Sequence, residues 1–194
     1  MLKFSKANAK TEALKQVDEL KPYLSDKRKI YSLDLLSGHS CPFANECLSK
    51  AVVIDGKRKI KDGKNTKFRC FSASQEVQYT NVFNSRKHNF DSLRSLHVND
   101  MIALLSDSLP KNAGIIRIHV AGDFFNRDYM FAWYTIAMMN PHVLFYAYTK
   151  SLRYWLAINE FPILHNFVLT ASYGGRDDHL IDDETFDFRS TKVV

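Results

Sequence analysis

The chain has 194 residues, of which 45% are hydrophobic and 25% charged, and these ordinary globular values exclude large-scale disorder. No apolar run approaches the roughly 18 residues of a membrane span, and the N-terminus lacks the apolar core of a signal peptide, so we expect a cytoplasmic protein with no membrane partner. The net charge of +6 makes the chain basic, and its odd number of cysteines argues against a disulfide framework.

The first half of the chain predicts a mixture of helices and strands. Apolar residues at helical spacing from Leu14 to Leu24 predict a helix that Thr11 caps and Pro22 ends or bends. Alternation predicts a strand over 29–35. We further expect a short helix over 44–51, strands over 52–54 and 68–71 with a basic loop between them, and helices over 72–84 and 99–109.

The second half predicts a βαβαβ unit. Apolar strands are expected over 115–120, 143–148 and 167–171, with helices over 126–140 and 151–159 between them. Each pair of strands is separated by one helix, as parallel pairing requires. The predicted fold class is α/β, a single domain over 1–194 with a partial or incomplete (β/α) barrel-like parallel sheet. Residues 28–72 form its region of cysteines and basic loop, and 113–175 form its βαβαβ core.

The carboxyl ends of parallel strands are where α/β proteins bind ligands. After the first strand of the core, alternation places Arg117 and His119 together on one face, Gly122 allows a tight turn, and Asp123 stands at the rim. We expect His119 and Asp123 to be catalytic and Arg117 and Gly122 to contact substrate. The alternative is a buried histidine bonded to a backbone carbonyl, with Asp123 as a loop or helix cap.

The next two strand ends carry groups suited to an anion. Lys150 and Ser151 follow the second strand, and Ser172 and Arg176 follow the third. Backbone N–H groups at a strand-to-helix junction, with a lysine beside them, favour an anionic group. The simpler alternative makes Ser151 a helix cap.

The cysteines suggest a metal site. Five residues separate Cys41 from Cys47, and Cys70 follows after another 22. With His39 they could hold zinc, and by themselves they could hold an iron–sulfur cluster with one iron open. The C-x₃-C-x₂-C spacing of ordinary radical S-adenosylmethionine enzymes is absent, as are phosphate-loop and nucleophile-elbow motifs. Ordinary buried thiols are the alternative.

A basic loop over 57–69 is a third candidate binding feature, after the strand ends and the cysteines. It contains one acid, Asp62, among seven basic residues: Lys57, Arg58, Lys59, Lys61, Lys64, Lys67 and Arg69. Such a run contacts phosphates in nucleotides or nucleic acids, although solvated loops also carry such runs.

Three segments resemble the phage "gene product 88" family: SGHSCPFANEC at 37–47, HVAGDFFN at 119–126 and FYAYTKS at 145–151. The family is of unknown function and is found in tailed phages. Its cysteine-rich start followed by βα units is similar to iron–sulfur proteins with partial barrels. The resemblance implies one site containing Cys41, Cys47, His119, Gly122 and Asp123. Family members continue into a second cysteine-rich segment that this sequence lacks, so we expect a truncated chain or a smaller ligand set.

Together these features favour a metal-dependent enzyme, iron–sulfur and of radical type, acting on an anionic substrate such as a nucleotide or nucleic acid in the host cytoplasm. S-adenosylmethionine is the cofactor that a radical reaction would add. The alternative is a zinc-stabilised or metal-free protein that binds nucleic acid or a host partner without catalysis.

Overall fold

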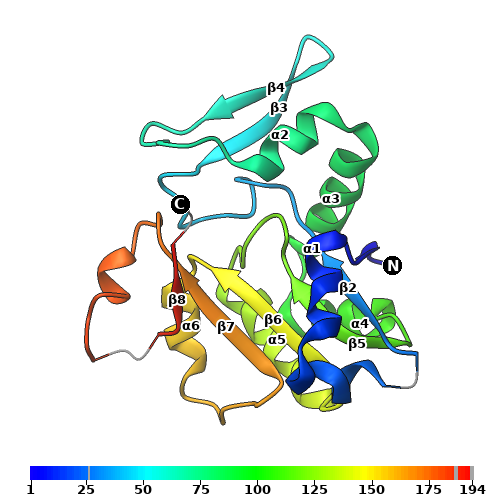
Figure 1. Cartoon of the computed structure of the whole chain (residues 1–194). Coiled ribbons are helices and arrows are strands. Elements are labelled where there is room, and N and C mark those ends of the chain that lie inside the picture. Colours follow the sequence, from blue (N-terminus) through cyan, green and yellow to red (C-terminus); the bar gives the residue numbers. More distant parts are fainter. Residues whose placement is uncertain (26, 186–187, 193–194) are drawn as a thin grey trace.

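A six-stranded sheet organises the part of the chain that the computed structural model describes, residues 1–25, 27–185 and 188–192. The strands are β1 (Phe4–Lys6), β2 (Lys29–Leu33), β5 (Ala113–Ile118), β6 (Leu144–Thr149), β7 (Phe167–Ser172) and β8 (Ser190–Thr191), in that spatial order (Figure 1). β1 is antiparallel to β2, and every other neighbouring pair is parallel. The predicted α/β class and the parallel βαβαβ core are therefore confirmed.

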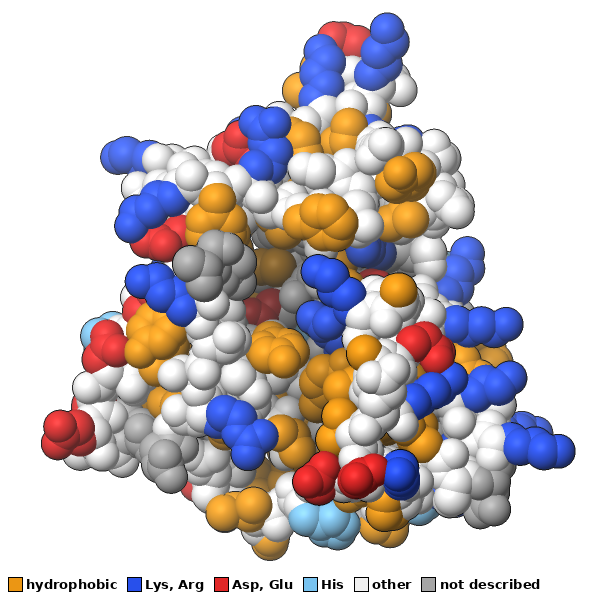
Figure 2. Space-filling model, in the orientation of Figure 1, with side chains coloured by type: hydrophobic (Ala, Val, Ile, Leu, Met, Phe, Trp, Pro, Cys, Tyr) orange, Lys and Arg blue, Asp and Glu red, His pale blue; other side chains and the backbone are white. Residues whose placement is uncertain are grey.

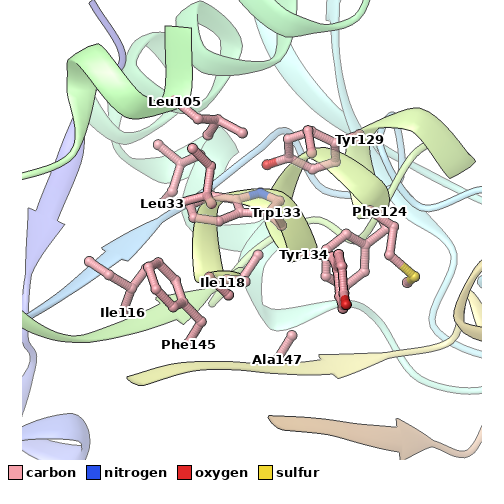
Figure 3. Close-up of a cluster of buried hydrophobic side chains, with 14 of the residues drawn as sticks. Leu33, Leu105, Ile116, Ile118, Phe124, Tyr129, Trp133, Tyr134, Phe145 and Ala147 are labelled. Atoms are coloured by element: carbon pink, nitrogen blue, oxygen red, sulfur yellow. The ribbon is translucent and has the colours of Figure 1, made fainter. Parts of the chain in front are cut away.

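Three helices cover one face of this sheet: α4 (Val98–Ser108), α5 (Arg127–Met139) and α6 (Leu152–Ile158). Ile116, Ile118 and Phe145 turn their side chains toward this face and lie around Trp133 of α5 (Figure 3). Trp133, Tyr129 and Phe124 are among the largest fully buried side chains. The helix-covered face of these strands is apolar, as in other parallel sheets, whereas the opposite face also carries polar residues such as Arg117.

The N-terminal segment covers part of the opposite face. It consists of α1 (Ala9–Glu12) and two 3₁₀ turns, η1 (Ala13–Gln16) and η2 (Asp18–Leu24). Leu14, Leu20 and Leu24 pack there against a buried patch that contains Ile30 and Ile115. The expected single α-helix is wrong here. Asn8 rather than Thr11 caps the first turn, and Pro22 lies inside η2. Proline lacks the N–H that a longer α-helix would need at that position.

The sheet is open in the part of the chain described. Its edge strands are β1 and β8, and these two strands do not pair with each other. A closed barrel is thus not seen among these residues.

An upper layer lies over the carboxyl ends of the strands (Figure 1). It holds the hairpin of β3 (Ser49–Ile54) and β4 (Lys57–Asp62), and the helices α2 (Phe71–Gln78) and α3 (Thr80–Leu93). The expected helix over 44–51 and strand over 68–71 are wrong, because β3 begins at Ser49 and α2 at Phe71. Much of the expected basic loop is a strand. The turn between the two strands is Asp55-Gly56, with φ values of 52° and 73°, as a two-residue hairpin requires.

The observed helix boundaries differ from the predicted ones at α2, α3 and α4 and agree at the start of α5. The helix expected over 72–84 is broken at Tyr79, which has an extended backbone (φ −115°, ψ 113°). Helix α4 begins after His97 rather than at Asn99. Asn126 caps α5 as predicted, its side chain accepting a hydrogen bond from the Tyr129 N–H at 2.8 Å. Within the described residues, none of these helices combines the length and apolar content needed to cross a bilayer.

Candidate functional site

The loops that follow β2, β5, β6 and β7 meet at one edge of the sheet, because parallel strands end on the same side. The loop after β2 carries Cys41 and Cys47, and the upper layer adds Cys70 at the start of α2. The loop after β5 carries Asp123, and the end of β6 carries Lys150. Most of the residues expected in a site therefore lie along this edge.

The three cysteines gather around a close contact between Gly38 and Ser49. The Gly38 N–H donates to Cys41 Sγ at 3.3 Å, and the Cys70 N–H donates to Ser49 Oγ at 3.2 Å. Cys47 precedes Ser49 by two residues. Gly38 has φ +68°, and a Cβ on it would stand 2.3 Å from the Ser49 carbonyl oxygen. Only glycine at position 38 allows the cysteine loop to come this close to Ser49 at the start of β3.

The electrostatic environment of the thiols confirms that they share one region. Burial raises the pKa of the Cys41 thiol, and the carboxylate of Asp123 and the other two cysteines raise it further. Burial also raises the pKa of Cys47, whereas the ammonium of Lys150 lowers it. All three cysteines are free thiols. The three cysteines therefore lie in one region, with Asp123 and Lys150 within electrostatic reach of it.

Asp123 ties two strand ends together. Its Oδ1 accepts hydrogen bonds from Thr149 Oγ1 at 2.6 Å and the Phe124 N–H at 2.8 Å, and its Oδ2 accepts one from the Lys150 N–H at 2.8 Å. Burial raises the pKa of this carboxyl and these hydrogen bonds partly offset the increase. Gly122 makes the turn possible with φ +91°, since a Cβ there would stand 2.6 Å from Ser40 Oγ.

Lys150 and Ser151 bind protein oxygens. The Lys150 ammonium donates to Ser172 Oγ at 2.7 Å and to the Tyr173 carbonyl at 2.6 Å, which joins the ends of β6 and β7. The Ser151 hydroxyl donates to the Phe124 carbonyl at 2.8 Å and does not cap α6. Arg176 is exposed, and its N–H donates to the Phe43 carbonyl at 2.9 Å. Of these expected anion-binding groups, Arg176 is the one whose charged end reaches solvent.

His119 does not share a face with Arg117, so that expectation is wrong. β5 ends at Ile118, and His119 has φ +69°, which reverses the alternation of side chains. Its Nε2 lies 3.1 Å from the Tyr129 hydroxyl, and its ring packs against Phe124 in the helix-covered core. Burial, with a smaller effect from Arg117, lowers the pKa of His119 to about 3, so its ring is neutral.

Arg117 and His39 also lie apart from the thiols. The Arg117 guanidinium lies over the Tyr148 ring, 5.4 Å from its centroid, on the face opposite the helices. His39 is exposed, and its Nε2 lies 3.0 Å from the Ala51 carbonyl oxygen on β3. The hydrogen bond from Lys87 lowers the pKa of Asp91 on α3, and the His39 ring adds a smaller effect in the same direction. The structure therefore does not bring His39 to the cysteines as a fourth ligand.

A buried ion pair beside this site has no signal in the sequence. Arg86 of α3 and Glu76 of α2 pair at 3.1 Å, with side chains 7% and 0% exposed. Glu76 Oε1 also accepts from the N–H and hydroxyl of Ser37, at 3.0 and 2.8 Å. The pair therefore anchors the start of the cysteine loop under α2. Both residues resemble ordinary charged positions of polar helices, so only their packing identifies them.

Among the residues described, no three His, Cys, Asp or Glu side chains are placed closely enough to hold a single metal ion. The thiols are neighbours, but they do not form a tetrahedral zinc site, in which each sulfur lies about 2.3 Å from the metal.

The fold and this edge define a mixed α/β protein with a free-thiol cluster above a mostly parallel sheet. The family model for gene product 88 matches residues 2–193, so the chain belongs to the gene product 88 family, as its motifs indicate. The Gene 88 proteins of the mycobacteriophages L5 and D29 are 32% and 30% identical to it over 90 residues. The matched region covers 42% of this chain and 38% of each relative. No solved structure matches the chain.

Proposed function

We propose that this protein is an iron–sulfur enzyme whose cluster is held by Cys41, Cys47 and Cys70. The observation that carries the proposal is that the three cysteines interact electrostatically with one another, with Asp123 and, at Cys47, with Lys150, near the contact between Gly38 and Ser49. Free thiols gathered at a ligand-binding edge suit metal binding, since a metal replaces the thiol protons and compensates the thiolate charges.

The arrangement of the available ligands favours a cluster over a single zinc ion. A single zinc ion needs its ligands in direct tetrahedral contact, and no such group exists among the described side chains. A cluster binds each cysteine through a different iron, so its ligands stand farther apart. Three cysteines leave one iron open, where a bound cluster could supply electrons or Lewis acidity to a substrate.

The residues around the thiols set the conditions for chemistry. Asp123, whose pKa is raised by burial, is the carboxyl that acts electrostatically on Cys41 and Cys47. Lys150 supplies positive charge beside Cys47 and fixes the ends of β6 and β7. The neutral ring of His119 lies in the buried core below this edge of the sheet, where its Nε2 contacts the Tyr129 hydroxyl. Arg176 is the exposed cation available to an anionic substrate.

Two features of the whole molecule support this assignment. The parallel strands follow one another in chain order with helices on one face, an order that suits a partial barrel. Figure 2 shows the surface hollowed between the upper layer and the sheet, which gives room for a substrate. Free thiols and a cluster both suit a reducing compartment such as the host cytoplasm.

The test is anaerobic purification and reconstitution with iron and sulfide, followed by metal and sulfide analysis and a visible spectrum. We expect a brown protein, and we expect Cys41→Ser, Cys47→Ser and Cys70→Ser each to lose most of the iron. His39→Asn is the matched control and should retain it, because His39 faces Ala51. A colourless, iron-free protein after reconstitution, or serine variants that keep their iron, would contradict the proposal.

A further inference from the structure

One face of the β3–β4 hairpin carries a row of lysines. In the antiparallel register Lys50 pairs with Lys61, Val52 with Lys59, and Ile54 with Lys57. Directly paired residues share a face of a sheet, and so do alternate residues of a strand. These two rules place four lysines on one side of the hairpin, with Val52 and Ile54 among them. We call this surface the lysine face: Lys50, Lys57, Lys59 and Lys61.

The opposite face fixes the hairpin in place. Arg58 donates from Nε to the Val77 carbonyl at 3.3 Å and from Nη2 to Thr80 Oγ1 at 2.7 Å. Its guanidinium also lies over the Phe83 ring, 5.4 Å from the centroid. Because the hairpin is held on α2 and α3 by this side, the lysine face must point outward. Figure 2 shows Lys and Arg side chains projecting from the hairpin at the top of the view.

The charge of the lysine face is not compensated within the described part of the chain. Of the acids near it, Glu46 is paired with Lys67 and Asp62 with Arg69. Asp55 lies in the exposed turn and leaves the four lysines with a clear excess of positive charge. None of the four lysines has a hydrogen-bond or ion-pair partner among the side chains described. Lys50 and Lys61 stand directly opposite each other, an arrangement that destabilises a strand pair. A bound anion would remove this repulsion.

We propose that the lysine face binds the phosphate backbone of a nucleic acid. Lys57, Lys59 and Lys61 are spaced about 6.8 Å apart, since alternate residues of an antiparallel strand are separated by about twice 3.4 Å. That spacing is comparable with the spacing of successive phosphates along an extended strand. The apolar side chains between the lysines, half-buried Val52 and exposed Ile54, can contact sugars and bases.

The lysine face also reaches the candidate site. The Lys50 side chain packs over Gly38, with its Cγ 2.7 Å from where a Cβ of that glycine would be, and the Gly38 N–H is bonded to Cys41 Sγ. A nucleic acid on this face would therefore run toward the thiol cluster. The binding surface goes beyond the proposed metal centre and does not depend on it.

The test is fluorescence anisotropy of the full chain with a labelled 20-nucleotide single strand and with the corresponding duplex, over a range of salt concentrations. The triple variant K57Q/K59Q/K61Q should bind at least 10-fold more weakly. Its log–log salt slope should be smaller in magnitude by about 2 on the single strand or by about 3 on the duplex. Whichever oligonucleotide binds more tightly, the single strand or the duplex, identifies the form of nucleic acid that the lysine face recognises.

The matched control, K6Q/K10Q/K111Q, removes the same charge from exposed lysines elsewhere and should bind as the parent does. Equal loss of affinity in both triple variants, or an unchanged salt slope in the hairpin variant, would overturn the proposal. Binding to anionic lipid vesicles with no binding to either oligonucleotide would also overturn it. Iron content of the hairpin variant should equal that of the parent, so failure here is distinguishable from failure of the metal proposal.

Discussion

His119 illustrates how one backbone angle changes the role of a residue. Histidine at the end of an apolar strand suggests a catalytic base, and its left-handed conformation (φ +69°) instead turns the ring into the core beside Tyr129 and Phe124. His119 Nδ1 has no partner among the described residues, and the ring is neutral. The residue is therefore a buried, neutral part of the core and not a solvent-accessible base.

The neutral state of His119 predicts a specific acid sensitivity. Its pKa is about 3 in the folded protein and about 6.5 in an unfolded chain. Between these pH values His119 is protonated in the unfolded state and neutral in the folded state. Acidification therefore lowers the free energy of unfolding by about 1.4 kcal/mol per pH unit. His119→Asn keeps a residue that tolerates positive φ and removes this titration.

Urea unfolding at pH 7 and pH 4 checks this prediction. Between the two, the parent should lose about 3 kcal/mol more than the variant. Asp34 and Asp123, whose pKa values burial raises, change stability in the opposite direction but equally in both proteins. Parallel pH profiles would show that His119 is protonated normally in the fold.

At the scale of elements, the cysteine loop depends on a close approach of β3. Gly38 and Gly56 both have positive φ, +68° and +73°, but only Gly38 is crowded. A Cβ on Gly38 would meet the Ser49 backbone, whereas a Cβ on Gly56 would meet nothing within 4 Å. The two glycines therefore separate the cost of a strained backbone from the cost of a steric clash.

Alanine at these two positions should differ in effect. Gly56→Ala should cost about 1–2 kcal/mol through the left-handed backbone alone. Gly38→Ala should cost about 2 kcal/mol more, because the loop must move away from Ser49. Thermal and urea unfolding of the two variants give the comparison. Equal destabilisation would mean that the loop gives way without cost and that the close approach is not required.

At the scale of the whole molecule, the upper layer is joined to the sheet through buried polar contacts. The Asn89 side chain of α3 donates to the Lys3 and Asp34 carbonyls at 2.9 and 3.0 Å. Glu76 of α2, which pairs with Arg86 inside the upper layer, accepts hydrogen bonds from Ser37 after β2. Glu76 Oε2 has no partner among the described residues. Loss of its cation would leave a buried carboxylate beside the cysteine loop.

Arg86→Met should destabilise the protein by about 3–5 kcal/mol, since it leaves Glu76 buried without its partner. Arg94→Met, at the end of the same helix, removes an exposed ion pair with Asp91 and should cost less than about 1 kcal/mol. Equilibrium urea unfolding measures both. A small effect of Arg86→Met would show that the buried ion pair does not stabilise the fold.

The sequence by itself determined the parallel core and most of the edge that carries the candidate site. Apolar strands separated by single helices allow few other arrangements, and parallel pairing then gathers Asp123, Lys150 and Ser172 at one edge. The motifs around Cys41 and Asp123 also indicated the family.

Only the tertiary structure decided the orientation of His119, the exclusion of His39 from the thiols and the buried Glu76–Arg86 pair. It also showed that the basic segment is a strand with its lysines on one face. The physical reason is that these features depend on backbone angles and contacts between residues far apart in the chain. Composition and periodicity describe only the local preferences of neighbouring residues.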